Sequence, residues 1–284
     1  MKIEEFKIKA YDKVNLYAKC WLPMNKPLGV IILIHGLGEH INRYNQWAKR
    51  FNNSGWAVAG IDLRGHGFSE GKRGNGNYHS YLNDIDSIFE FVSKEFENLP
   101  KVLYGHSMGG NLALGYEITR KPDIERLIVT SPWLKLVNPP AITLQIMSRI
   151  FVKLFPSLSV SNRLNSYHIS RDKAICEDYK KDPLVHNQIS LSSFLQMQDW
   201  AAVILKNKHK ISVPLLLLHG SDDKITSCKG SDIFARETSD NTQFKIWENC
   251  YHELHNEVYK EEIFEFISLW LSEIQNLKHK ANVG

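Results

Sequence analysis

Residues 101–110 read Lys-Val-Leu-Tyr-Gly-His-Ser-Met-Gly-Gly, and this stretch decides the fold. Its apolar run at residues 102–104 predicts a strand, and the segment that follows is compatible with a helix. A sharp turn between the two requires very small residues two positions before and after Ser107, where Gly105 and Gly109 stand. The helix start would present unpaired N–H groups to an oxygen that becomes negative during acyl transfer. This serine–glycine spacing also occurs in ordinary loops, but a strand before it and a helix after it favour a nucleophile elbow.

Strands and helices alternate on both sides of this turn. A continuous apolar run, typical of a strand buried on both faces of a parallel sheet, lies at residues 30–34, and further strands are expected at residues 56–61, 126–130 and 214–218. Helix-compatible segments separate them, and residues 3–22 alternate in character around Asp12-Lys13, as an antiparallel hairpin does. We therefore expect an α/β fold with a mostly parallel sheet of about eight strands and helices on both faces. Its active site should lie at the carboxyl ends of the strands.

The alternation stops between residues 132 and 209, which we interpret as an inserted helical cap. This insertion carries ten Lys or Arg and five Asp or Glu, so it holds the positive charge of a chain whose formal net charge is +4. We expect the core to comprise residues 1–131 and 210–278, with the last helix ending near Leu277 and a tail at residues 279–284.

Within the insertion, residues 142–155 place apolar side chains on one helical face, with Arg149 and Lys153 on the other. Such a face packs on the core in most soluble proteins. Beside basic residues it also suits contact with a membrane surface that carries anionic head groups. The sequence leaves both interpretations open.

The composition narrows the classes of function. With 43% hydrophobic and 23% charged residues, the chain resembles an ordinary soluble protein, and a net charge of +4 without a basic run argues against nucleic acid binding. The four cysteines are too far apart for Cys-x-x-Cys pairs, so we expect reduced thiols and no metal site. Acidic residues stand where a signal peptide needs an apolar core, and no run approaches the roughly 18 apolar residues of a membrane span. We expect a cytoplasmic protein that meets membranes only peripherally.

Two further strand ends supply partners for the serine. A serine hydroxyl is a weak nucleophile until a base removes its proton, and a histidine does this best when a carboxylate fixes its tautomer. In a sheet of this kind the order is Ser, then Asp or Glu, then His. Asp222 and Asp223 follow the strand at 214–218, and His252 follows an expected strand at 243–247. Adjacent aspartates after a strand are usually turn or helix-cap residues, but three strand ends in the required order favour a triad.

Six motifs give the chain a family resemblance. They are His35-Gly36-x-Gly38-Glu39-His40, Gly65-His66-Gly67-x-Ser69-x-Gly71, Gly105-His106-Ser107-Met108-Gly109-Gly110, Asp182-Pro183-Leu184-Val185, Gly220-Ser221-x-Asp223 and Tyr251-His252-x-x-His255-x-Glu257. From about residue 5 to 275, the sequence resembles the monoacylglycerol lipase and lysophospholipase branch of the α/β-hydrolase fold, within the S33-type serine aminopeptidases. The resemblance implies that Ser107 is the nucleophile, Asp223 the acid and His252 the base. The family pattern Gly-Ser-x-Asp implies that the acid is Asp223 and not Asp222.

The resemblance also implies substrate contacts. The N–H groups of Leu37 and Met108 would form the oxyanion hole, and residues 132–209 would be a cap over an acyl-binding tunnel. Arg43 and Tyr179 match positions that contact the substrate head group. From the sequence alone, Arg43 is as easily a surface residue of the first helix.

The implied activity is that of a serine carboxylester hydrolase without a cofactor. It would cleave a single long-chain acyl ester, such as a monoacylglycerol or a lysophospholipid, through an acyl-enzyme intermediate. Ile175 stands where animal monoacylglycerol lipases have a glutamate beside the glycerol, which leaves the head group open. The alternatives are an S33-type aminopeptidase, a general short-chain esterase, and a non-catalytic lipid-binding module that would lack a triad member.

Overall fold

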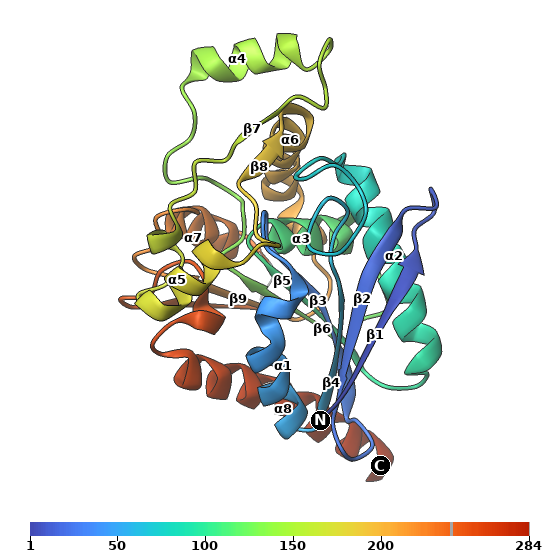
Figure 1. Cartoon of the computed structure of the whole chain (residues 1–284). Coiled ribbons are helices and arrows are strands. Elements are labelled where there is room, and N and C mark those ends of the chain that lie inside the picture. The colour runs from blue at the N-terminus through green and yellow to red at the C-terminus, as the bar shows by residue number, and fades with distance from the viewer. Residues whose placement is uncertain (239–240, 284) are drawn as a thin grey trace.

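An eight-stranded sheet forms the centre of the computed structural model, which describes residues 1–238 and 241–283. Its strand order is β1-β2-β4-β3-β5-β6-β9-β10 (Figure 1). The strands are β1 (Lys2–Lys9), β2 (Asn15–Leu22), β3 (Gly29–Ile34), β4 (Trp56–Ile61), β5 (Lys101–His106), β6 (Arg126–Thr130), β9 (Leu215–Gly220) and β10 (Thr242–Trp247). The first two pair antiparallel with each other, β2 is antiparallel to β4, and the other pairs are parallel. The predicted fold class is confirmed.

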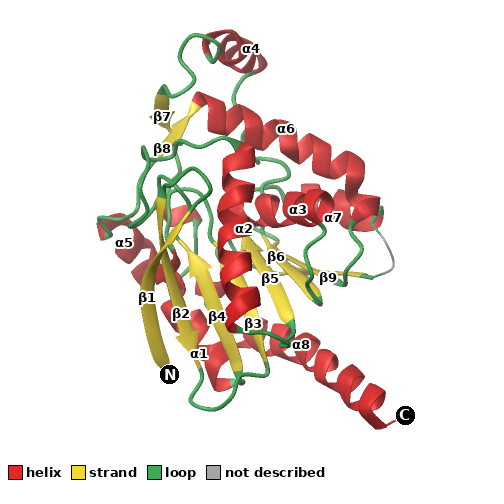
Figure 2. Ribbon diagram, turned by 90° about the vertical axis from the view of Figure 1, so that its right-hand side faces the viewer, coloured by secondary structure: helices red, strands yellow, loops and turns green. Residues whose placement is uncertain are grey.

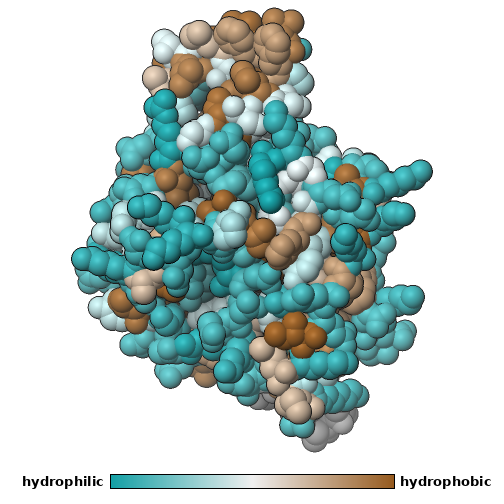
Figure 3. Space-filling model, in the orientation of Figure 1, coloured by the Kyte–Doolittle hydropathy of each residue, from teal (hydrophilic) through white to brown (hydrophobic). Residues whose placement is uncertain are grey.

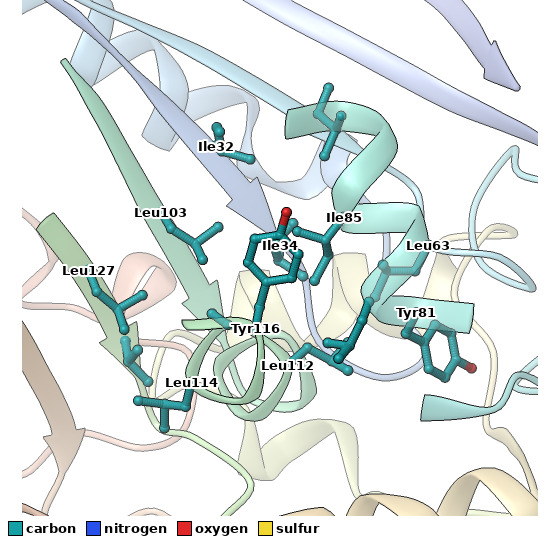
Figure 4. Close-up of a cluster of buried hydrophobic side chains, with 14 of the residues drawn as sticks. Ile32, Ile34, Leu63, Tyr81, Ile85, Leu103, Leu112, Leu114, Tyr116 and Leu127 are labelled. Carbon is teal, nitrogen blue, oxygen red and sulfur yellow. The ribbon is translucent and has the colours of Figure 1, made fainter. Parts of the chain in front are cut away.

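Helices cover both faces of the sheet. Successive side chains of a strand point to opposite sides, so an apolar strand exposes apolar side chains on each face that a helix layer must cover. The helices packed on the sheet or beside it are α1 (Asn45–Asn53), α2 (Tyr78–Glu95), α3 (Met108–Arg120), α7 (Cys228–Arg236) and α8 (Lys260–Val283). Ile32 and Leu103 point to the face of α2 and α3, where they meet Ile85 and Leu112 (Figure 4). The side chain of Ile31 points to the opposite face, which α1 and α8 cover. Two hydrophobic cores thus lie on opposite faces of the sheet.

The strand register brings the predicted site residues to one edge of the sheet. Ile34 of β3 pairs with Gly105 of β5, and His106 pairs with Thr130 of β6, so these strands end at the same level. Likewise, β9 and β10 run in parallel to their last residues. The loops after β3, β5, β9 and β10 therefore meet above the carboxyl ends of the strands.

Residues 132–209 connect β6 to β9 and lie above this edge (Figure 2). They contain α4 (Ile142–Phe151), α5 (Lys173–Lys181), α6 (Leu191–Asn207) and a small antiparallel pair of β7 (Ser159–Ser161) and β8 (Gln188–Ser190). The remaining short elements are the 3-10 helices η1 (Ile41–Tyr44), η2 (Ser166–His168), η3 (Lys208–Lys210) and η4 (Leu254–Asn256).

The apolar face of α4 does not pack on the core. The helix stands away from the body of the molecule, and hydrophobic residues gather on the surface there (Figures 1 and 3). Its large apolar side chains and those that follow it are exposed: Ile142, Leu144, Ile146, Met147, Ile150, Phe151, Leu154, Phe155 and Leu158. Its main polar tie is an ion pair of Arg149 with Asp199 on α6. The packing interpretation of this face is therefore wrong.

The end of the last helix also differs from the prediction. α8 continues to Val283, beyond the expected end near Leu277, because neither glycine nor proline interrupts residues 261–283. Only Gly284 of the expected tail lies outside the described residues. Among the residues that the structure describes, no helix has both the length and the hydropathy to cross a membrane.

Candidate active site

Ser107 occupies the turn between β5 and α3, with the strained backbone angles φ 56° and ψ −115°. Close packing enforces this turn. A Cβ atom on Gly105 would lie 2.4 Å from the carbonyl oxygen of Gly109, and one on Gly109 would lie 2.2 Å from the carbonyl oxygen of Ile34. Both glycines are thus required sterically, as their spacing predicted. A non-glycine residue held in this conformation costs on the order of 1–3 kcal/mol, and the surrounding sheet supplies the restraint.

The structure brings Ser107, His252 and Asp223 together in one hydrogen-bonded array. The Oγ atom of Ser107 lies 2.9 Å from Nε2 of His252, and Nδ1 of His252 lies 2.7 Å from Oδ2 of Asp223. Asp222 is not part of this array, because its carboxylate pairs with Arg171 at the surface. Since the carboxylate can only accept, Nδ1 of His252 carries a proton and Nε2 is left free to take the proton of Ser107.

The electrostatics of the array suit a base at His252. Burial alone would lower the pKa of His252, but the negative charge and hydrogen bond of Asp223 raise it above its ordinary value of 6.5. Burial would raise the pKa of Asp223, yet the charge of His252 and hydrogen bonds from His219 and His252 lower it well below its ordinary value. Asp223 is therefore ionised, and the backbone N–H groups of Ile225 and Thr226 bind its other oxygen at 2.7 and 3.0 Å.

The predicted oxyanion-hole residues lie beside Ser107, Leu37 on the loop after β3 and Met108 at the start of α3. Met108 opens α3, so its N–H has no acceptor in the preceding turn of that helix. Leu37 follows Gly36, which is so close to the serine that an added Cβ would lie 3.1 Å from Cβ of Ser107. Two hydrogen bonds hold this loop: the N–H of Gly36 donates to Oε1 of Glu39, and the carbonyl of Gly38 accepts from the N–H of His186. The loop between β3 and η1 is thus fixed against the elbow.

Arg43 lies in a buried ion cluster. The interpretation of Arg43 as a surface residue of the first helix is therefore wrong. Its guanidinium donates to Glu39 at 2.8 Å and to both oxygens of Glu253 at 2.6 and 2.7 Å. It also lies 4.6 Å from the ring centroid of Tyr179, so the structure brings the two predicted head-group residues into contact. Although burial opposes it, the charge of Arg43 lowers the pKa of Glu253 to about 2. The i,i+4 spacing of Glu39 and Arg43 was a signal for part of this cluster, but nothing in the sequence indicated Glu253.

Access to the array is narrow. Ser107 is 8% exposed and His252 is 3% exposed. A groove of about 750 Å³ lies between α4 and α6, lined by apolar residues such as Ile150 and Leu195 and by Arg149. All the residues that line this groove belong to the insertion, and Ser107, His252 and Asp223 are not among them.

The eight-stranded sheet and the elbow at the carboxyl end of β5 define this protein as an α/β-hydrolase. The chain belongs to the family described as serine aminopeptidase, S33, whose sequence model matches residues 25–259. It is therefore a hydrolase. This class agrees with the resemblance that the six motifs carry.

Individual relatives show which proteins of this family the chain is similar to. Over 95% of its length, the chain is 40% identical to an uncharacterized abhydrolase domain-containing protein of Dictyostelium discoideum, of which it spans only 29%. It is 30% identical to human monoglyceride lipase, covering 92% of this chain and 88% of the lipase. The crystal structure of Paleococcus ferrophilus monoacylglycerol lipase superimposes with a TM-score of 0.83 at 31% identity, covering 90% of this chain and 98% of that one.

Proposed function

We propose that this protein is a serine carboxylester hydrolase that cleaves a single long-chain acyl ester, such as a monoacylglycerol or a lysophospholipid. The observation that carries the proposal is the continuous array from Ser107 through His252 to Asp223, with contacts of 2.9 and 2.7 Å. Relatives named monoglyceride lipase over nearly the full chain support the substrate class.

In the proposed reaction, Oγ of Ser107 attacks the ester carbonyl carbon while Nε2 of His252 takes its proton. The N–H groups of Leu37 and Met108 stabilise the oxyanion that forms. The tetrahedral intermediate collapses, the C–O bond to the alcohol breaks, and the alcohol leaves with the proton from His252. A water molecule then gives a proton to His252 and attacks the acyl carbon. The bond from this carbon to Oγ of Ser107 breaks, Oγ takes the proton back from His252, and the fatty acid is released. The reaction needs no cofactor.

We propose that residues 132–209 act as a cap over the acyl-binding region and shift to admit substrate, because Ser107 and His252 are almost fully buried. Arg43 and Tyr179 would border the head group. Since Arg43 is held by two carboxylates, it would act as a fixed wall of this region and would not swing toward the ligand.

We also propose that the cap contacts a lipid surface. Leu154 and Ile150 are 72% and 62% exposed, within a larger apolar patch on α4 and the loop that follows it. Vesicles that contain anionic lipid should therefore sediment the protein, and Ile150→Glu with Leu154→Glu should reduce this binding. Leu269→Glu on α8 is a matched control, since Leu269 is 71% exposed outside the insertion. Equal binding of the cap variant and wild type would remove membrane contact from the proposal.

The activity itself is tested with p-nitrophenyl esters of increasing chain length, followed by natural monoacylglycerols, lysophospholipids and an aminoacyl anilide. We expect turnover to be greatest on long-chain esters, whereas a maximum at short chains or on the anilide would favour an esterase or an aminopeptidase. Ser107→Ala should lower kcat by on the order of 10⁴ with little loss of stability. Unimpaired turnover by this variant, or no reaction of wild type with a fluorophosphonate probe, would refute the serine mechanism.

A further inference from the structure

A second buried histidine binds the carboxylate of Asp223. His219 is the penultimate residue of β9 and is fully buried. Its Nε2 atom lies 3.1 Å from Oδ2 of Asp223, the same oxygen that lies 2.7 Å from Nδ1 of His252. One carboxylate oxygen thus stands between two imidazole rings that approach from different strand ends.

The surroundings of His219 determine which of its nitrogens carries the proton. Nε2 lies near two groups that can only accept, the carboxylate of Asp223 and, at 3.2 Å, the backbone carbonyl of Thr226. Nδ1 lies 2.8 Å from the hydroxyl of Ser231 on α7, which can donate. His219 therefore carries its proton on Nε2, and Ser231 donates to Nδ1 and holds the ring in this tautomer.

His219 completes a ring of donors around the carboxylate. Two backbone N–H groups bind Oδ1 of Asp223, and Oδ2 is reached by His252, by His219 and, at 2.9 Å, by the hydroxyl of Thr226. The backbone groups fix one oxygen, so His219 and Thr226 decide how the second oxygen is presented to His252. Charge on Oδ2 is shared among these donors, which limits how strongly it attracts the proton of His252.

We propose that His219 is a positioning residue that orients the second oxygen of Asp223 toward His252 and shares its negative charge. The inference rests on the proposed function, in which His252 is the base. Without the N–H of His219, Oδ2 would be less well oriented and would hold more charge toward His252. The imidazolium form of His252 would then be favoured over the neutral form that catalysis needs.

The test compares kcat, KM and the pH profile of kcat/KM on a short soluble ester for wild type and three variants. His219→Leu removes the donor, His219→Gln keeps an N–H donor at similar reach, and Ser231→Ala frees the tautomer of His219. We expect His219→Leu to lower kcat about tenfold with KM nearly unchanged. Because the pKa of His252 rises, the acid limb of the profile should move to higher pH by on the order of half a unit. His219→Gln should restore most of the loss, and Ser231→Ala should shift the limb the same way by less.

The pH profile separates positioning from a merely structural role. The titratable groups that face His252 lie on several elements: Asp223 on the β9 loop, His106 on β5, Glu39 on the β3 loop, Glu253 just before η4 and His255 within η4. None of the variants alters these groups. As a control, His66→Leu removes another fully buried imidazole and should lower the unfolding temperature without moving the acid limb.

The outcomes also separate this inference from the function on which it rests. An inactive wild type, or an unimpaired Ser107→Ala, would overturn the proposed function. An active wild type whose acid limb stays in place in both His219→Leu and Ser231→Ala would overturn only the role of His219. If His219→Leu fails to fold by circular dichroism, Ser231→Ala decides, since it removes one hydroxyl and leaves the ring in place.

Discussion

Replacing Arg43 by methionine tests how much its buried ion pairs contribute to the free energy of unfolding. Glu39 and Glu253 are 4% and 3% exposed at their side chains, and the guanidinium of Arg43 lies between them. Arg43→Met keeps the length of the side chain but removes the cation. Two carboxylates would then be buried side by side without a counter-charge, and each would repel the other.

The structure sets the size of the expected loss. Breaking a buried ion pair by removing one partner costs about 3–5 kcal/mol, because a charge is left buried and unpaired. The lowering of the pKa of Glu253 from 4.5 to about 2 corresponds by itself to about 3 kcal/mol. For a domain of this size, such a loss lowers Tm by roughly 5–8 °C.

Urea unfolding at pH 7, followed by circular dichroism, measures this loss. Arg50→Met is the matched control, since Arg50 on α1 pairs with Glu261 at the surface and such pairs contribute at most about 1 kcal/mol. Combining Arg43→Met with Glu253→Gln should recover part of the loss, because one of the unpaired charges is removed. A cost for Arg43→Met no larger than that of the control would refute the buried-cluster argument.

The same variant has a pH signature. The pKa of Glu253 is depressed in the folded state, so the stability that it contributes is present above its ordinary pKa of 4.5 and is lost as the pH falls toward about 2. The stability difference between wild type and Arg43→Met should therefore be full at pH 7 and smaller by about 1 kcal/mol or more at pH 4. A difference that does not change between these pH values would contradict the electrostatic origin of the loss.

Three other predictions concern the array. Asp223→Asn should lower kcat/KM by on the order of 10⁴, whereas Asp222→Asn should change it only a few-fold, and the reverse order would move the acid to Asp222. Gly109→Ala should lower both Tm and the rate of fluorophosphonate labelling, since its Cβ would lie 2.2 Å from the carbonyl of Ile34, and labelling at the wild-type rate would contradict this. Because the pKa of His252 lies above 6.5, kcat/KM should fall as the pH drops through that raised value, and a profile flat down to pH 5 would exclude His252 as the base.

Much of the fold was predictable because the central strands are buried on both faces. Their apolar runs have sharp limits, and the strands at residues 56–61 and 126–130 lie where the sequence predicted them. Helix starts were less accurate. The sequence predicts an amphipathic helix at residues 81–97, whereas α2 begins at Tyr78, because Asn77 caps it by accepting a hydrogen bond from the N–H of Ser80.

The site was predictable where its geometry is local. Gly105 and Gly109 indicate the turn at Ser107, since the contacts that exclude larger residues lie within one strand–helix unit or the neighbouring strand. Arg43 shows the limit, because its partner Glu253 is 210 residues away along the chain and only the completed sheet brings the two together. Long-range pairs of charges leave no periodic pattern in the sequence.

The insertion combines two features that a folded core alone does not require. Its apolar helix α4 stands exposed, while the serine beneath the insertion is almost fully buried. Exposed apolar area costs about 25 cal/mol per Å², so a patch of this size is unfavourable in water unless something covers it. The proposed long-chain acyl ester would account for both features. Such a substrate would reside in a lipid surface that could cover α4, and its reacting carbonyl would have to be transferred to a site closed to water. On this argument, a lipid surface should raise the turnover of long-chain esters more than that of short soluble ones. Equal stimulation of both would show that the exposed helix and the buried serine serve separate purposes.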